Sequence, residues 1–363
     1  MSSELERRLE SLLAEAPEPD AGAGEEALHR ALRALQPSAP SHRGLRTAVL
    51  VFAIAAVLLA IAAGSLAAAG ALHVSFGQRT KHRPVTTTQL LRPKGANGIA
   101  AIVDGRLAVA IKGGFRVEGL TASAVALSPH ALYFAAGLGH SLVAMAPGGR
   151  TAWSHPTGDE VVAIAWAPDG FRIAYVVRHG RRFALRAIYG DGTHDALIDR
   201  SVRPVRPSWR ADNLAFAYVG AGGHAVVYDV GHEKHSVSGA AAPVTHVSFA
   251  PVGKALAVAT PGSVVLNGKR VATSEVEALG WRQDGRLEAA FENGVTPPLV
   301  RMFERNGRQL GGFRVPGRVL TVSSGFVMTR TPNRIIAGWQ QQANARSVLS
   351  VGPEASIRDL QLG

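Results

Sequence analysis

The sequence is dominated by one motif that recurs at intervals close to forty residues. Each copy holds a short apolar run, an aromatic residue or leucine, a tight turn rich in Pro, Asp, Gly or Asn, and a second apolar run. The copies are Val125–Phe134, Ile164–Tyr175, Pro207–Phe216, Val247–Gly253 and Leu279–Gly285. Their anchor residues, Leu127, Trp166, Trp209, Phe249 and Trp281, are separated by steps of 39, 43, 40 and 32 residues. Repeats of this length bury their core by stacking on one another, so we predict an array of similar units.

The local chemistry of the motif indicates β-structure. Asp-Gly and Asp-Asn pairs, as at Asp169-Gly170 and Asp212-Asn213, supply the positive φ angles that a tight hairpin needs. The aromatic residue before the turn offers apolar surface that can pack between neighbouring repeats. The totals of 40 Gly and 20 Pro suit many short strands joined by turns. Because a unit of four strands takes about 40–45 residues, we expect one four-stranded sheet in each repeat.

Two of these copies have a recognisable form. Trp166–Tyr175 and Pro207–Phe216 resemble the WD40-like repeat of TolB-type β-propellers, and Ile188–Thr193 resembles the outer hairpin of that repeat. The resemblance extends over residues 98–361 and implies an all-β fold, a six- or seven-bladed β-propeller. Ile102–Ala108 and Ser324–Val327 are candidate first and last copies. With these two copies the number of blades would be seven. One short step between copies keeps six blades as the alternative.

An apolar segment precedes the repeats. No Asp, Glu, Lys or Arg lies between Arg46 and Arg79, and residues 47–72 are almost wholly Ala, Leu, Val, Ile and Phe. About 20 such residues span a bilayer as a helix, so we predict one transmembrane helix over residues 47–72. A cleaved signal peptide is the alternative, with Ala69-Gly70-Ala71 as its cleavage site. The apolar run is longer than a signal peptide's core and 46 residues precede it, which favours a retained anchor.

The basic residues that flank this helix are balanced on its two sides, so charge alone does not set its orientation. The resemblance to TolB-type repeats places the β-propeller outside the cytoplasm of a bacterial cell, on a single-pass anchor. We therefore divide the chain into a cytoplasmic tail (1–46), a transmembrane helix (47–72), a linker that could add a closing strand (73–97) and the β-propeller (98–363).

The N-terminal tail has two short amphipathic patterns. Leu5, Leu9 and Leu12 recur at helical spacing, and a second helix is predicted from Glu25 to Leu35. Two such helices cannot bury a core of their own. One interpretation is a docking site for a cytoplasmic regulator, as in an anti-sigma protein. The other, which we favour, is a weakly ordered leader before the membrane.

Residues with catalytic or metal-binding chemistry do not form a recognised pattern. The chain has no Cys, which excludes disulfides, cysteine-ligated zinc and thiol catalysis. Asp191, Asp195 and Asp199 lack the alternating spacing of a calcium loop, and Asp191-Gly192 reads as a turn. Four histidines, at positions 224, 232, 235 and 246, share one repeat, where His232 and His235 could approach each other. We interpret them as loop residues and assign no catalytic, cofactor-binding or metal-binding residue.

Two further features bear on partners. Trp153, Trp166, Trp209, Trp281 and Trp339 are interpreted as packing residues rather than a ligand cage, because three of them are repeat anchors. The formal net charge is +12, and the part after residue 46 carries 33 Lys and Arg against 19 Asp and Glu. That charge could attract anionic lipid headgroups or envelope polymers. No dense basic cluster of the kind that binds nucleic acid is present, so we expect no nucleic-acid partner.

These features favour a membrane-anchored extracytoplasmic β-propeller that acts as a binding or scaffold module and is not an enzyme. We expect no cofactor and a protein or anionic envelope partner. One alternative is a transmembrane signalling protein in which the β-propeller senses and the tail holds a cytoplasmic regulator. Another is a β-propeller enzyme of the lyase or lactonase type, which would need carboxylates or histidines that converge at the channel mouth. No G-x-S-x-G serine elbow occurs in the sequence.

Overall fold

A computed structural model describes the chain from residue 96 onward, with gaps. The described ranges are 96–111, 116–146, 148–232, 234–237, 243–291, 298–323, 325–331, 334–339, 346–350 and 355–362. They belong to one compact unit, Pro84–Gly363. The predicted tail helices and the predicted transmembrane helix (47–72) lie outside these ranges. Within these ranges, no helix has the length and apolar character needed to cross a bilayer.

The described strands form seven four-stranded sheets in which neighbouring strands are antiparallel. The first sheet has the order β28-β1-β2-β3, and each of the others takes four consecutive strands of the chain. The first sheet comprises β28 (Ile357–Leu362), β1 (Gly98–Val103), β2 (Arg106–Ile111) and β3 (Arg116–Thr121). The second comprises β4 (Ala124–Leu127), β5 (Phe134–Leu138), β6 (Ser141–Met145) and β7 (Thr151–Pro156), with a short 3-10 helix at Pro129–Ala131. The third comprises β8 (Glu160–Trp166), β9 (Arg172–His179), β10 (Arg182–Tyr189) and β11 (Ala196–Asp199).

The remaining four sheets repeat this plan. The fourth comprises β12 (Ser208–Trp209), β13 (Ala215–Val219), β14 (Ala225–Asp229) and β15 (Lys234–Val237). The fifth comprises β16 (His246–Phe249), β17 (Leu256–Thr260), β18 (Ser263–Leu266) and β19 (Lys269–Ala272). The sixth comprises β20 (Val276–Trp281), β21 (Leu287–Phe291), β22 (Leu299–Phe303) and β23 (Gln309–Arg314). The seventh comprises β24 (Arg318–Ser323), β25 (Phe326–Thr331), β26 (Arg334–Trp339) and β27 (Arg346–Ser350).

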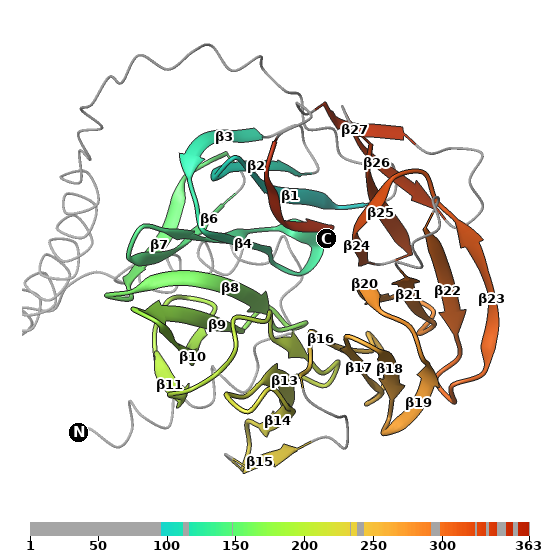
Figure 1. Cartoon of the computed structure of the whole chain (residues 1–363). Helices are drawn as coiled ribbons and strands as arrows, with labels where there is room; N and C mark the ends of the chain where they lie inside the picture. The colour runs from blue at the N-terminus through green and yellow to red at the C-terminus, as the bar shows by residue number, and fades with distance from the viewer. Residues whose placement is uncertain are drawn as a thin grey trace, which may run out of the picture. The chain divides into compact units, whose positions relative to one another are not determined.

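The first strands of the sheets make a closed ring (Figure 1). Going round it, β28 contacts β4, and contacts then follow through β8, β12, β16, β20 and β24 back to β28. A sheet edge normally exposes unpaired backbone groups, and a ring turns seven such edges toward one central channel. The four-stranded repeat is therefore present throughout the described part of the chain, including the repeat with the 32-residue step.

The ring is closed by the C-terminal strand. The closing strand that the sequence suggested for residues 73–97 falls mainly on residues outside the described ranges. β28 pairs with β1 as the innermost strand of the first sheet, so residues 357–362 supply the strand that closes it. For the same reason Ile102–Ala108 is not a first copy of the motif. Its turn, Asp104-Gly105, joins the second and third strands of the sheet, whereas the motif turn joins the first and second.

The apolar core of the described residues is divided into seven clusters, each between two neighbouring sheets. In one cluster Ile102 and Leu107 of the first sheet pack with Val125 and Phe134 of the second. Ala135, the residue after Phe134 in the same strand, faces the other way, into the cluster shared with the third sheet. Because both faces of these sheets are covered, the second strand of each sheet, such as β13 or β21, is buried at successive positions rather than at alternate ones. The outermost strands, such as β7, alternate exposed and half-buried residues.

The motif turns have the geometry that their residues predict. Gly170, Asn213 and Gly285 all have positive φ, at 77°, 61° and 79°. In each turn the preceding Asp accepts a hydrogen bond from a backbone N–H two residues on, as at Asp169 with Phe171 N (2.9 Å). This side-chain bond is the reason that Asp stabilises the turn. The Asp191-Gly192 turn has the same bond, from Thr193 N (2.9 Å), and joins β10 to β11 as the outer hairpin.

The tryptophan anchors pack between sheets, which confirms the prediction for those described. Trp209 and Trp281 are 6% and 5% exposed and donate their indole N–H to backbone oxygens of the preceding sheet, Ala165 O and Ser248 O (both 3.0 Å). Trp153 donates in the other direction, to Gly190 O (2.7 Å). The Trp166 indole N–H is buried without a hydrogen-bond partner. The side chain of Trp339 lies outside the described residues.

Candidate functional site: turn face and central channel

One end of the ring carries the motif turns, and we call it the turn face. The turns between the third and fourth strands lie at the same end, because successive strands run in opposite directions. Exposed apolar side chains gather there. Of the eight large apolar residues that are exposed in the described ranges, six lie in these turns. We call the six the turn-face arc: Leu132, Tyr133, Phe171, Tyr189, Leu214 and Val252.

The arc follows four consecutive sheets, from the second to the fifth. Phe171 is its most exposed member, at 73%, and Leu214 is 53% exposed. Both directly follow the turn residue with positive φ. At the equivalent position of the fifth and sixth sheets the chain has Lys254 and Arg286. The turn geometry therefore does not require an apolar residue there.

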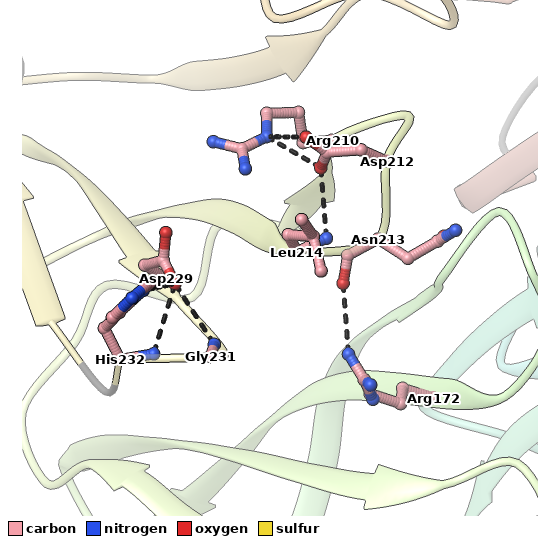
Figure 2. A network of polar contacts seen from close by, with 8 residues as sticks. All are labelled: Arg172, Arg210, Asp212, Asn213, Leu214, Asp229, Gly231 and His232. Atoms are coloured by element: carbon pink, nitrogen blue, oxygen red, sulfur yellow. Dashed lines mark hydrogen bonds and ion pairs between the residues drawn. The ribbon is translucent and has the colours of Figure 1, made fainter.

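Hydrogen bonds between neighbouring turns hold part of the arc in place. Asp169 N donates to the Asn213 side-chain oxygen, and Arg172 Nη1 donates to the Asn213 backbone oxygen (both 3.0 Å). These bonds tie the turn that carries Phe171 to the turn that carries Leu214. Figure 2 shows the Arg172 contact beside the Asp212 turn. The arc is thus presented on a fixed scaffold, which lowers the entropic cost of binding.

The same turns carry charges that are paired locally. Arg210 Nε donates to both carboxylate oxygens of Asp212 (2.8 and 2.9 Å), which lowers the pKa of Asp212. Asp229 accepts from His232 Nδ1 (2.9 Å) and from the backbone of Gly231 and His232, and the His232 contact lowers the pKa of Asp229 (Figure 2). These contacts pair the charged side chains of the turns with one another. The apolar arc is therefore surrounded by polar groups whose charges are locally balanced.

The central channel forms a cavity of about 600 Å³. It is lined by residues of β12, β16, β20, β24 and β28 and of the adjacent loops, including Trp209, Phe249 and Trp281. Among the described lining residues, Arg206 and Asp359 are the charged ones, and Arg206 Nη2 meets Asp359 Oδ1 at 2.6 Å. Burial lowers the pKa of His246, which also lines the channel, and so favours its neutral form. A volume of this size is typical of a small-molecule pocket.

The Arg206 side chain is not fully satisfied. Its Nε is buried and has no hydrogen-bond partner. An unpaired buried donor of this kind costs about 1–3 kcal/mol. Sequence analysis did not single out Arg206 or Asp359, because neither belongs to a repeated motif and they are 153 residues apart.

The predicted aspartate series is separated into three structural roles. Asp191 makes the turn described above. Asp195 accepts from Tyr175 Oη (2.8 Å) and Arg186 Nε (2.9 Å) and lies 3.2 Å from His155 Nε2 of the preceding sheet. Asp199 accepts from Tyr218 Oη (2.8 Å). Burial raises the pKa of Tyr175 and Tyr218, and both keep their protons as donors.

The predicted histidine group is also dispersed. His232 contacts Asp229, whereas the His235 Nδ1 lies 2.9 Å from the Tyr218 hydroxyl, so the two do not meet. His224 is exposed in the turn between β13 and β14, and His246 Nδ1 lies 3.1 Å from Thr245 Oγ1. Within the described ranges no three His, Asp or Glu side chains are grouped as a metal site would need.

Comparison with known proteins addresses the fold. No family model matches the chain, and no curated protein sequence matches it. A chain of the mitotic checkpoint complex crystal structure is similar over 69% of this chain and 89% of its own length, with 16% identity and a TM-score of 0.55. The fold is a β-propeller.

TolB from Acinetobacter baumannii is also similar in structure, with 15% identity and a TM-score of 0.44. That match covers 60% of this chain and 64% of the TolB chain. The structural relatives are thus TolB and WD40-type propellers, which the repeat motif predicted. At these identities the likeness concerns the fold alone, and what the propeller binds has to be argued from its own surface.

Proposed function

We propose that this chain is a membrane-anchored extracytoplasmic propeller with seven blades that binds a protein through its turn-face arc, without catalysis. The observation that carries the proposal is the exposure of Phe171 and Leu214 at turn positions where other blades have Lys254 and Arg286. Exposed apolar groups that gather on one face and are ringed by polar ones characterise protein interfaces. The seven sheets supply the blades.

A protein partner fits the arc better than a lipid surface does. The turns that carry the arc also expose Asp169 and Asp191. These carboxylates would repel the anionic headgroups of a bacterial membrane. A protein surface can instead cover the apolar groups and leave the carboxylates at a hydrated rim. We therefore expect a partner whose contact surface presents apolar side chains, with polar or basic residues around them.

The matched positions give a test that the fold tolerates. In Phe171→Lys/Leu214→Lys, both arc residues become the type found at the equivalent turn of the fifth blade. Leu197→Lys changes an apolar residue that is 41% exposed on the outer strand β11 and serves as the control. The full chain is cross-linked in its native cells, and proteins captured by each variant are quantified against the wild type.

We expect at least one protein to be captured by the wild type and by Leu197→Lys but lost from the double variant. If all three capture the same proteins in the same amounts, the arc is not the docking surface and the proposal is wrong.

The anchor rests on the apolar run of residues 47–72, and its orientation rests on the resemblance to TolB-type repeats. The absence of Cys allows a direct test, because single cysteines can be introduced without background labelling. With Ser41→Cys before the apolar run and Arg182→Cys on the propeller, a membrane-impermeant maleimide should label only the propeller position in intact spheroplasts. Labelling of Ser41→Cys alone, or of both positions, would refute the proposed topology.

A further inference from the structure

Two irregular segments meet inside the central channel, and neither is part of the turn-face arc. The first precedes β12. Regular pairing of β12 is limited to Ser208 and Trp209, because Pro204 and Pro207 lack the N–H that a ladder uses. Val205 N donates to Arg203 O (2.8 Å) within the same segment instead. Arg206 lies between the two prolines and lines the channel.

The second segment is in β28, the strand that closes the ring. The register of β28 against β1 shifts between Arg358 and Gln361, which is a β-bulge. Asp359 lies in the bulge with a φ of 48°, which is rare for a residue other than glycine. Its carboxylate accepts from Val125 N (3.1 Å) of the neighbouring blade and faces Arg206. Bulges and strained residues of this kind re-aim side chains and are concentrated at functional sites.

The contact between Arg206 and Asp359 spans the channel. In the ring, β4 and β8 separate β28 from β12 on one side, and β16, β20 and β24 separate them on the other. Interblade packing therefore does not account for this ion pair, which joins blades that are not neighbours. The Arg206 side chain is 34% exposed and the Asp359 side chain is 20% exposed, so water and small solutes can reach the ion pair.

The guanidinium retains binding capacity on the edge that faces Asp359. Arginine binds a carboxylate best through two parallel N–H groups on one edge. Asp359 takes the Nη2 group, while the buried Nε has no partner. An incoming carboxylate that displaces Asp359 could take Nη2 and also reach the Nε that Asp359 leaves unpaired. Among the described lining residues one carboxylate already faces one arginine, so a singly charged ligand fits better than a dianion.

We propose that the central channel binds a small organic monocarboxylate, which pairs with Arg206 and displaces Asp359 from it. The cavity of about 600 Å³ admits a small molecule, and Trp209, Phe249 and Trp281 among its lining residues favour a ligand with an apolar body. None of the six residues of the turn-face arc lines this cavity, so each proposal can fail without the other.

Benzoate, acetate and inorganic phosphate serve as probes, and their binding to the purified full chain is measured by titration calorimetry. Tryptophan fluorescence gives a second measurement, because Trp209 and Trp281 line the channel. We expect benzoate to bind more tightly than acetate, and acetate more tightly than phosphate. Asp359→Asn frees the whole edge of the guanidinium and should bind benzoate about tenfold more tightly, which corresponds to about 1.4 kcal/mol. Arg206→Gln should lose the binding, and Arg206→Lys should recover only part of it because lysine lacks the fork.

Arg182→Gln removes an exposed arginine on a different strand and should bind benzoate as the wild type does. Thermal melts of each variant exclude misfolding as the cause of a loss, and misfolding cannot produce the gain expected for Asp359→Asn. The proposal is overturned if benzoate fails to bind the wild type, even when Asp359→Asn binds it, since Asp359 would then fill the site. It is equally overturned if Arg206→Gln binds benzoate unchanged.

Discussion

Glu288 should make the propeller less stable as the pH rises through neutrality. It lies in β21, is 0% exposed, and neither carboxylate oxygen has a hydrogen-bond partner. The nearest cation that contacts it is Arg282 Nη1, at 3.6 Å. Burial raises the pKa of Glu288 to about 7, against an opposing effect of Arg282. The reason is that burial disfavours the charged form of a carboxyl group.

The sign and size follow from linkage. The ordinary pKa of this carboxyl is 4.5, so the folded chain holds the proton more tightly than the unfolded chain does. The stabilisation is complete below about pH 4.5 and is lost as the pH rises through about 7. A shift from 4.5 to about 7 corresponds to about 3 kcal/mol, most of it lost between about pH 5 and pH 8.

Glu288→Gln removes the titration while keeping the shape of the side chain. Urea unfolding of wild type and variant at about pH 5 and pH 8 measures the effect as a difference, so that other titrating groups cancel. We expect the variant to be more stable at the higher pH by up to about 3 kcal/mol and not at the lower pH. Glu275 is an exposed glutamate just before β20, and Glu275→Gln is the control. It should not change the free energy of unfolding at either pH. An equal effect of Glu288→Gln at both pH values would refute the reasoning.

Two further predictions concern side-chain hydrogen bonds, one between blades and one within a blade. Trp281→Phe removes an indole hydrogen bond to Ser248 O, whereas Trp166→Phe removes a similar ring whose N–H has no partner. By urea unfolding the first should therefore cost about 1 kcal/mol more than the second, and equal costs would contradict the assigned role of the bond. Asp195→Asn should lower the free energy of unfolding by about 2 kcal/mol, because Arg186 would keep its charge without a carboxylate. A free energy of unfolding equal to that of the wild type would show that the hydrogen bonds of Asp195 contribute nothing to stability.

The turn-face arc could have been found in part from the sequence. Alignment of the repeat copies places Phe171 and Leu214 at the position of Lys254 and Arg286, and this contrast is visible without a structure. What the alignment lacks is the exposure of these side chains and the bonds through Asn213 that tie their turns together. Tyr189 joins the arc from a different turn, since Gly190 N donates to Phe171 O (2.7 Å).

The repeating unit follows from local residue preferences that are visible in the sequence. Two local effects produce it: the φ preferences of turns such as Asp169-Gly170 and Asp212-Asn213, and the bulk of the tryptophan anchors. Because each acts within a few residues, the pattern can be recognised in the sequence. Tertiary structure decided how the ring closes and what its channel holds. Ser356 N donates to an Asp104 carboxylate oxygen (2.7 Å) across 252 residues of chain, and Arg206 reaches Asp359 across 153. Such contacts depend on the number and stacking of all the blades, which no local residue preference encodes.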